Sequence, residues 1–473
     1  MFPVAIYTFG CKLNQLETEA LAASFRNAGF PVLPWETAME GQGIIIINTC
    51  TVTSKADQKS RRIIRKALRE NPESCVIVTG CYAHLDAGEI ESLVSGESAG
   101  AAGVRRLFFP GAGGEDGAGS SKSALLHLPL YIREAMANNG CAVNGSLSNG
   151  TQLPAILESW IRQERGTSPF GFMPGKFTFH SRGYLKIQDG CDSACAYCRV
   201  QLARGPSLSL PGEEALRELL ALEAAGCAEL MITGVNISQY RYNGCDLAGL
   251  LEYLLEGSTS IALRLSSLEP DIIDERLAAV LAHPRIRPHF HIAVQSLSAA
   301  VLKKMGRAYS PEKAAEGAAL LRSVKDNPFI ACDIIAGFPG ENEAEFALTL
   351  ERCEKIRFAW IHAFPFSKRP GTAAFSFEDT VCERDVTRRI EALNGFSRRG
   401  RRDYAHSWLG KELTAVAEKG KTAQGQCRAV SENYLKLLVD CAGEDPLPGS
   451  SIRCVPVSLC EAGSECDAIA VIK

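Results

Sequence analysis

Strand and helix signals alternate along most of this chain, and the alternation restricts the possible fold more than any other feature. Near the N-terminus, apolar runs at 4–8, 43–48 and 75–79 are separated by helical stretches that have one apolar face. Strands that alternate with helices form parallel sheets, because each helix carries the chain back to the edge where the next strand begins. This part of the chain is therefore predicted to be α/β, with an open parallel sheet.

A second series of strand and helix signals begins near residue 178 and continues to about residue 400. Its apolar runs lie at 230–233, 262–266, 289–293, 331–335 and 359–364. Repeated βα units predict a partial or full parallel barrel, whose functional site lies at the carboxyl ends of its strands.

The remaining segments differ in pattern from these two series. Residues 96–119 are rich in Gly, Ala and Ser, as in a flexible linker, and 153–164 is the one clear helix signal in the stretch that follows. After about residue 409, short strand-like runs broken by Gly and Pro are typical of a small β-barrel. We therefore expect four parts: an N-terminal α/β domain (1–110), a linker and irregular insertion (111–177), a βα barrel (178–405) and a small β-barrel (406–473).

Composition excludes several classes of protein. The 473 residues are 46% hydrophobic and 22% charged, which excludes bulk disorder. A net charge of −3 excludes a protein that coats nucleic acid non-specifically, so any such contact must come from local basic patches. Apolar runs are shorter than a membrane span, and the N-terminus lacks the basic residues of a secretory signal. We expect a cytoplasmic protein with no membrane partner.

The chain contains 18 cysteines, a high number for a reducing compartment, where cysteine clusters more often indicate metal binding or catalysis than disulfides. Cys11, Cys50 and Cys81 each follow one of the three N-terminal strand signals closely. The carboxyl ends of parallel strands meet at one rim, where ligands usually bind. The three cysteines are therefore expected to converge, with coincidence as the alternative.

A second group of cysteines lies within CDSACAYC, at Cys191, Cys195 and Cys198. A cubane iron–sulfur cluster is normally held by four thiolates, so three on one loop would leave one iron without a protein ligand. The alternatives are a zinc site with a remote fourth ligand and accidental clustering. The spacing of three and then two intervening residues is unusual for zinc, which favours iron and sulfur.

CDSACAYC resembles the CxxxCxΦC signature of radical S-adenosylmethionine (SAM) enzymes. Further segments resemble the methylthiotransferases among them: GCKLNQLETE, NTCTVTSKAD, VTGCYA, KIQDGCD, ITGVNISQY, LRLSSLEP, HFHIAVQSLS, MGRAYS, DIIAGFPGENEAEF and FPFSKRPGTAAF. The resemblance covers nearly the whole chain except about 96–175. It implies a radical-SAM barrel over 178–405 and, over 406–473, a TRAM domain, which is a small RNA-binding β-barrel.

The resemblance also implies the cofactors and the reaction. Cys191, Cys195 and Cys198 would hold a 4Fe–4S cluster whose open iron chelates SAM, and reduction of that cluster would cleave SAM to a 5′-deoxyadenosyl radical. Cys11, Cys50 and Cys81 would hold a second 4Fe–4S cluster, where sulfur is presented and methylated. GCKLNQLETE is similar to the members that add a methylthio group to carbon-2 of threonylcarbamoyl-adenosine beside the anticodon of tRNA. The partners would be tRNA through its anticodon stem-loop, a reducing electron donor and a sulfur source.

Residues that bind SAM are expected at the barrel's strand ends. In the family, the turn with Gly234 and Asn236 approaches the SAM amino group, and a glycine permits such close backbone approach. Glu269, Gln295 and Arg307 stand at or beyond strand ends, where they could bind the SAM ribose or carboxylate. For each, an ordinary turn or a surface ion pair is the alternative. GFPGE at 337–341 either lines the adenine site or forms a tight loop.

Two basic runs, 61–69 and 398–402, are candidates for phosphate contact or for solvated faces. Tyr434 could stack on a base or belong to the core. Two features depart from the family pattern: RVQLARGPSLSL follows Cys198, and acidic residues outnumber basic ones after residue 405. The alternative functions are methylthiolation of isopentenyl-adenosine in tRNA or of a ribosomal-protein aspartate, a non-catalytic iron–sulfur RNA-binding protein, and a zinc-stabilised α/β protein.

Overall fold

The computed structural model describes most of the chain as two compact units. The described residues are 1–35, 43–93, 106–111, 122–138, 152–163, 168–175, 177, 179–441, 445–461 and 463–473. The first unit comprises 1–178, 189–193 and 198–208, and the second comprises 179–188, 194–197 and 209–473. Most of the linker expected at 96–119 lies outside the described residues. None of the described helices is long and apolar enough to cross a membrane.

The first unit is built on a five-stranded parallel sheet in the order β2-β1-β3-β4-β5. Its strands are β1 (Val4–Thr8), β2 (Val32–Pro34), β3 (Ile44–Thr49), β4 (Cys75–Gly80) and β5 (Leu107–Phe108). Strand β2 is added on one side of β1, and β3, β4 and β5 are added in turn on its other side. The carboxyl ends of β1 and β3 therefore flank a topological switch point, where open sheets of this kind bind their ligands.

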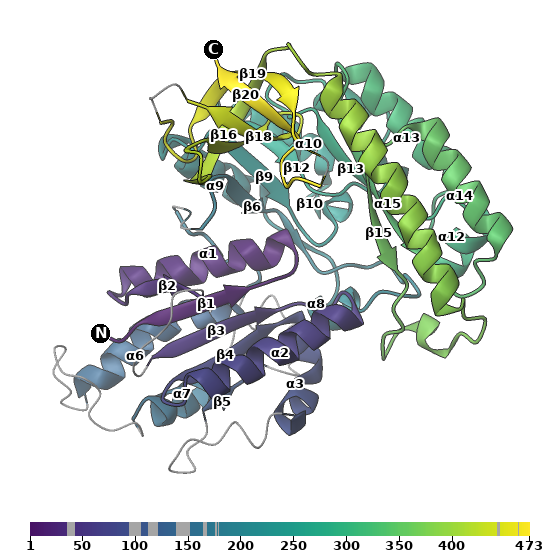
Figure 1. Cartoon of the computed structure of the whole chain (residues 1–473). Helices are drawn as coiled ribbons and strands as arrows, with labels where there is room; N and C mark the ends of the chain where they lie inside the picture. The colour runs from purple at the N-terminus through teal and green to yellow at the C-terminus, as the bar shows by residue number, and fades with distance from the viewer. Residues whose placement is uncertain are drawn as a thin grey trace. The chain divides into compact units, whose positions relative to one another are not determined.

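Helices cover both faces of this sheet, as Figure 1 shows for α1 and α2. The helices are α1 (Lys12–Asn27), α2 (Ser54–Glu70), α3 (Cys81–Leu93), the 3-10 turn η1 (Ala124–Leu126), α6 (Leu128–Asn138) and α7 (Gln152–Gln163). Side chains alternate across the strands, so that Ile45, Ile47 and Val78 pack against Ile64 and Leu68 of α2. The basic face of α2 lies opposite this apolar contact and is largely exposed.

The second unit contains a parallel array that runs in the order β6, β9, β12, β13, β14, β15. Its strands are β6 (Gly183–Lys186), β9 (Glu229–Thr233), β12 (Ala262–Leu265), β13 (His289–Gln295), β14 (Phe329–Ala336) and β15 (Trp360–Pro365). A parallel bridge between Leu268 and Ile292 joins its two halves. Within the described residues no pairing joins β15 back to β6, so the predicted barrel is a partial one.

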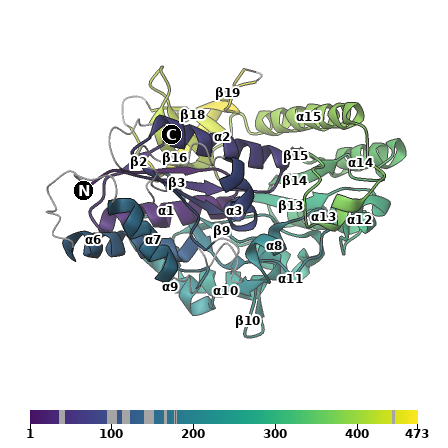
Figure 2. The ribbon, with the colours of Figure 1, turned by 90° about the horizontal axis from the view of Figure 1, so that it is seen from below.

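Helices pack along the outside of this array, and Figure 2 shows α13 and α14 beside β13, β14 and β15. The helices of this part are α8 (Val200–Arg204, assigned to the first unit), α9 (Gly212–Ala224), α10 (Leu247–Gly257), α11 (Glu275–Leu281), α12 (Ala299–Met305), α13 (Pro311–Val324), α14 (Glu343–Ile356) and α15 (Glu383–His406). Short elements complete it: β7 (Gln188–Asp189), β8 (Leu208–Ser209), β10 (Arg241–Tyr242), β11 (Cys245–Asp246), η2 (Ile237–Gln239), η3 (Pro270–Ile272) and η4 (Ala373–Ser376).

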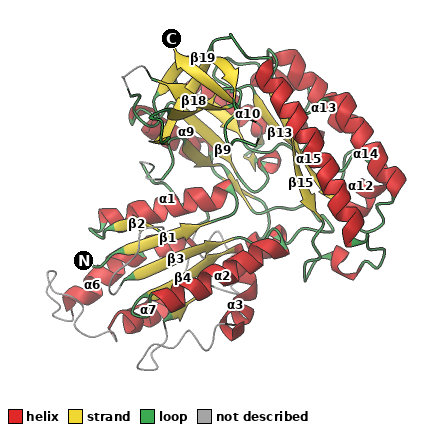
Figure 3. Ribbon diagram, viewed as in Figure 1, coloured by secondary structure: helices red, strands yellow, loops and turns green. Residues whose placement is uncertain are grey.

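The C-terminal strands form a closed barrel in the order β16-β17-β18-β20-β19 (Figure 3). They are β16 (Leu413–Lys421), β17 (Cys427–Ser431), β18 (Lys436–Asp440), β19 (Ser451–Leu459) and β20 (Ala468–Ile472). Its core continues into the parallel array through Phe329 and Tyr404. The predicted small β-barrel is thus confirmed.

One described segment differs from the sequence prediction. Helix α6 was not predicted, because its buried Leu128 and Ile132 form only one short apolar face beside a proline.

Candidate functional site

Three cysteines of the first unit lie at the carboxyl ends of neighbouring strands. Cys11 caps α1 just after β1, Cys50 directly follows β3, and Cys81 follows β4 as the first residue of α3. Gly10, with a φ of +117°, lets the first loop approach the second. A β-carbon at this position would lie 2.6 Å from the Cys50 Cβ and 3.1 Å from its Sγ. The predicted convergence of these strand ends is therefore present in the structure.

The pKa values of Cys11 and Cys50 are raised by burial and by neighbouring thiols. Burial, followed by the neighbouring Cys11 and Cys81, raises the pKa of Cys50 to about 12. Burial and Cys81 likewise raise the pKa of Cys11, while Arg204 opposes this shift. Thiols in such a setting become thiolates only when a metal replaces their protons.

The three thiols are not gathered as closely as the ligands of a single zinc ion, whose sulfur ligands lie about 3.8 Å apart. Among the described residues, the one group of three potential ligand atoms within 4.8 Å of one another lies elsewhere, in the C-terminal barrel.

A buried network of charges lies beside these cysteines. The guanidinium of Arg204 donates to Glu17 Oε1 and Asp189 Oδ1, each at 3.0 Å, and through Nε to Cys81 Sγ at 3.4 Å. Lys122 also donates to Glu17 and, at 3.1 Å, to Asn14 Oδ1. Glu17 and Asn14 belong to the GCKLNQLETE segment, so that segment builds the surroundings of the thiols as well as supplying Cys11.

Arg199 is the first residue of RVQLARGPSLSL, the segment after Cys198 that departs from the family pattern, and the structure gives it a specific partner. Arg199 pairs with both carboxylate oxygens of Asp86 at 2.9 and 3.0 Å, and its Nη1 lies 3.4 Å from Thr51 Oγ1. Asp86 interrupts the helical geometry of α3 with φ −128° and ψ 29°. An apolar residue at 199 could not form this bidentate pair.

The cysteines of CDSACAYC lie on the loop between β7 and α8. Within the first unit, the Cys191 amide donates to Gly205 O at 3.1 Å, and Cys198 Sγ accepts from the Val200 amide at 3.4 Å. Within the second unit, Cys195 Sγ accepts from Arg307 Nη1 at 3.2 Å. The next residue, Ala196, is held by its backbone to Met305 O at 2.9 Å.

Three of the five residues expected to bind SAM are joined through polar contacts in the second unit, and Gly234 lies beside them. Arg307 pairs with Glu269, and Asn236 Nδ2 lies 3.5 Å from Glu269 Oε1. The Asn236 amide donates to Gln188 Oε1 at 2.8 Å. A β-carbon on Gly234 would lie 2.9 Å from the same oxygen, so a glycine is needed for this approach.

Gln295 and the GFPGE loop lie at neighbouring strand ends. Gln295 ends β13 with a φ of +58°, which is uncommon for a residue other than glycine and is found at ligand sites. Glu341 of GFPGE is buried and accepts from the Gly337 amide at 2.6 Å and from Arg389 at 2.8 Å. These contacts agree with the tight-loop alternative for GFPGE.

Sequence reasoning missed a second polar group, which lies on the same strands. Burial alternates along β13, so that His291, like Gln295, faces the partly open side of the strand. His291 contacts Ser267 Oγ at 2.7 Å through Nδ1 and Asp333 Oδ1 at 3.2 Å through Nε2, and His362 lies beside it. Single polar residues within apolar strands, as in HFHIAVQ and FIACDIIA, are the signal that could have identified this group.

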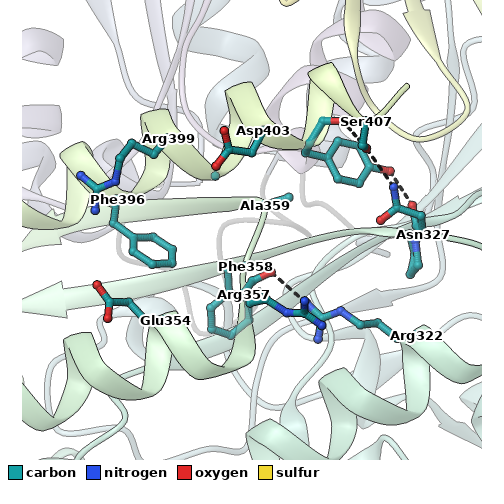
Figure 4. A pocket seen from close by; sticks show the side chains of 13 residues that line it. Arg322, Asn327, Glu354, Arg357, Phe358, Ala359, Phe396, Arg399, Asp403 and Ser407 are labelled. Atoms are coloured by element: carbon teal, nitrogen blue, oxygen red, sulfur yellow. Dashed lines mark hydrogen bonds between the residues drawn. The ribbon is translucent and has the colours of Figure 1, made fainter. Parts of the chain in front are cut away.

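A cavity of about 510 Å³ lies at the opposite ends of the strands, near the first residues of β14 and β15. Arg322, Arg357 and Arg399 line it from three different segments (Figure 4). Within the 398–402 run, Arg401 pairs with Asp467 at 2.5 Å and is not available to a ligand. Tyr434 packs on His289 with ring centres 4.0 Å apart, which agrees with the core alternative.

Comparison with known proteins follows the same division of the chain. Residues 3–98 match the model of the uncharacterized protein family UPF0004, and residues 185–353 match the model of the Radical SAM superfamily. The threonylcarbamoyladenosine tRNA methylthiotransferase MtaB of Treponema pallidum (strain Nichols) is 38% identical over 96% of this chain and 98% of its own length. MtaB of Thermotoga maritima is 34% identical over 92% and 91%. The tRNA-2-methylthio-N(6)-dimethylallyladenosine synthase of a Wolbachia species is 28% identical over 88% of each chain.

Proposed function

The chain belongs to the radical-SAM methylthiotransferase family, and we propose that it adds a methylthio group to carbon-2 of threonylcarbamoyl-adenosine beside the anticodon of tRNA. The observation that carries this proposal is the 38% identity, over nearly the full length of both chains, to a relative named for that reaction. Relatives above 30% identity, at 38, 34 and 32%, carry this name, whereas the dimethylallyladenosine synthase is 28% identical, which favours threonylcarbamoyl-adenosine as the substrate.

Cys191, Cys195 and Cys198 are the proposed ligands of the cluster that works with SAM. Bound there, a 4Fe–4S cluster supplies the electron for reductive cleavage of SAM. Arg307 donates to Cys195 Sγ at 3.2 Å, and such a donor stabilises negative charge on the sulfur. The same guanidinium holds Glu269, so one side chain positions both a cluster ligand and a SAM ligand.

Cys11, Cys50 and Cys81 are the proposed ligands of a second 4Fe–4S cluster. The raised pKa values of Cys11 and Cys50, to which neighbouring cysteines contribute, support this assignment. Their location at neighbouring strand ends also supports it. Arg204, a member of the buried charge network, donates to Cys81 Sγ. We propose that this contact holds the Cys81 side chain in position as a cluster ligand. The reaction would also require a reducing electron donor and a source of sulfur.

SAM is proposed to bind Gly234, Asn236, Glu269, Gln295 and Arg307. Replacing Glu269 with alanine is expected to weaken SAM binding by about 10- to 100-fold, because a charged hydrogen bond contributes about 1.5–3 kcal/mol. Anaerobic titration calorimetry on the reconstituted enzyme measures this change. Glu351→Gln, which alters an exposed carboxylate paired with Lys355, is the control. Unchanged affinity in Glu269→Ala would remove Glu269 from the proposed site.

The tRNA is proposed to bind through its anticodon stem-loop, with His291, Asp333 and His362 facing the adenine. The exposed basic face of α2 and the cavity with Arg322 and Arg399 are proposed phosphate contacts, because arginine suits phosphate recognition. Neither surface depends on the C-terminal barrel, whose acidic balance is poorly suited to phosphate.

Nucleoside mass spectrometry of tRNA tests the proposed substrate. Deleting the gene is expected to abolish the methylthio derivative of threonylcarbamoyl-adenosine and to let the precursor accumulate. Complementation with the natural gene should restore the methylthio derivative, and complementation with the Cys195→Ala variant should not. If only the dimethylallyl- or isopentenyl-adenosine derivative disappears, the substrate assignment is wrong. If the tRNA profile is unchanged, the aspartate of a ribosomal protein becomes the substrate to examine.

A further inference from the structure

Two buried thiols and a carboxylate gather at one end of the C-terminal barrel, away from the six proposed cluster ligands. Cys427 begins β17, Cys441 follows β18, and Asp445 lies just beyond. Their two Sγ atoms and a carboxylate oxygen all lie within 4.8 Å of one another, and no other His, Cys, Asp or Glu group among the described residues does so.

Strand pairing explains why the two thiols meet. Cys427 is in register with Val439 of β18, and Cys441 follows Val439 by two residues. The side chains of Cys427 and Cys441 therefore lie on the same face of the sheet. That face is the barrel interior, where Cys427 is 5% exposed and Cys441 8% exposed. Around a tetrahedral zinc ion, with bonds of about 2.3 Å to sulfur and 2.0–2.2 Å to oxygen, ligand atoms lie about 3.5–3.8 Å apart. With all three atoms within 4.8 Å of one another, and Cys427 Sγ 3.9 Å from Asp445 Oδ1, small side-chain adjustments bring the group to this spacing.

Asp445 divides its two oxygens between different partners. Oδ1 lies 3.9 Å from Cys427 Sγ, and Oδ2 pairs with the Lys421 ammonium. The lysine thus leaves one oxygen free to turn toward the thiols. Two thiolates, one carboxylate, one lysine and a divalent cation sum to zero charge, so the filled site carries no uncompensated charge at the barrel rim.

We propose that Cys427, Cys441 and Asp445 bind one zinc ion, with water in the fourth position, independently of the iron–sulfur ligands and of the proposed reaction. Thiolate and carboxylate donors at tetrahedral spacing are a ligand set that zinc accepts. Cysteine binds zinc as a thiolate, so binding of the ion releases the thiol protons. The ion would tie β17 to the end of β18.

Metal analysis of the full-length enzyme tests this site. The protein is purified anaerobically from zinc-supplemented cells, reconstituted with iron and sulfide, and analysed by mass spectrometry of the elements. We expect about one zinc per chain in addition to the iron. The Cys427→Ser/Cys441→Ser double variant should lose the zinc and keep the iron. Cys454→Ser, which alters a buried cysteine of the same barrel outside this group, should keep both.

Zinc K-edge X-ray absorption identifies the ligands without interference from iron. Two sulfur neighbours at about 2.3 Å and oxygen at about 2.0–2.2 Å are expected. Because the double variant could misfold, Asp445→Asn provides a second test at an exposed residue. The zinc affinity of this variant, measured by competition with a chromophoric chelator, should be at least tenfold lower than that of the natural enzyme. Absence of zinc from the natural enzyme, zinc retained in the double variant, or a spectrum without sulfur neighbours would overturn the proposal.

Discussion

Replacing Cys195 with alanine is expected to lower SAM cleavage by about 100-fold or more, whereas replacing Cys50 should leave cleavage intact and abolish methylthio transfer. The difference arises because the two cysteine groups are proposed to hold separate clusters with separate tasks. Formation of 5′-deoxyadenosine measures SAM cleavage, and mass spectrometry of an anticodon stem-loop substrate measures transfer. Iron should fall from about eight to about four per chain in either variant.

Two buried cysteines provide matched controls. Cys75 begins β4 at the end remote from Cys81, and Cys332 lies within β14. Alanine at either position should preserve the iron content and both activities. An iron content of about four in the natural enzyme would contradict the second cluster. Zinc at two or more ions per chain in place of iron would instead favour a zinc-stabilised α/β protein, and full iron without SAM cleavage would favour a non-catalytic iron–sulfur protein.

Replacing Arg204 with methionine is expected to destabilise the first unit by about 3–5 kcal/mol. The guanidinium is 2% exposed and lies between the carboxylates of Glu17 and Asp189, which are equally buried. Without it, the buried carboxylates of Glu17 and Asp189 lose the cation that pairs with both, so more negative charge in the interior is left without compensation. Denaturant unfolding followed by near-ultraviolet circular dichroism measures the loss.

Arg69→Met is the control for the arginine variant. Arg69 is 69% exposed on α2 and contacts only the neighbouring Glu70, so its replacement should change the unfolding free energy by less than about 0.5 kcal/mol. Equal stability of the Arg204 and Arg69 variants would show that the buried charges do not support the fold.

The sequence predicted the strands of both parallel arrays because their apolar runs are continuous and are followed by turns. The run at 44–47 is four isoleucines, all completely buried in β3. From such strands it also follows that Cys11, Cys50 and Cys81 meet, since parallel strands share a carboxyl edge. The resemblance, rather than the spacing, supplied the residues expected to bind SAM.

Contacts between distant side chains could not be predicted in this way. Nothing local to Arg204 indicates Glu17 as its partner, because the pairing depends on how loops fold back over the sheet. Similarly, nothing in the sequence around Cys427 and Cys441 indicates that their thiols meet, because the antiparallel register of β17 and β18 brings them together. The open or closed state of the parallel array also depends on strand tilt, which periodicity does not encode.

The buried pair of Glu17 and Arg204 has a consequence for synthesis of the protein on the ribosome. The two residues are 187 positions apart, although both belong to the first unit. At about 5–20 residues per second, Glu17 is added to the chain roughly 10–40 s before Arg204. The first unit therefore cannot complete its folding as soon as its sheet has been translated, and its final assembly must wait until the beginning of the second unit has also left the ribosome.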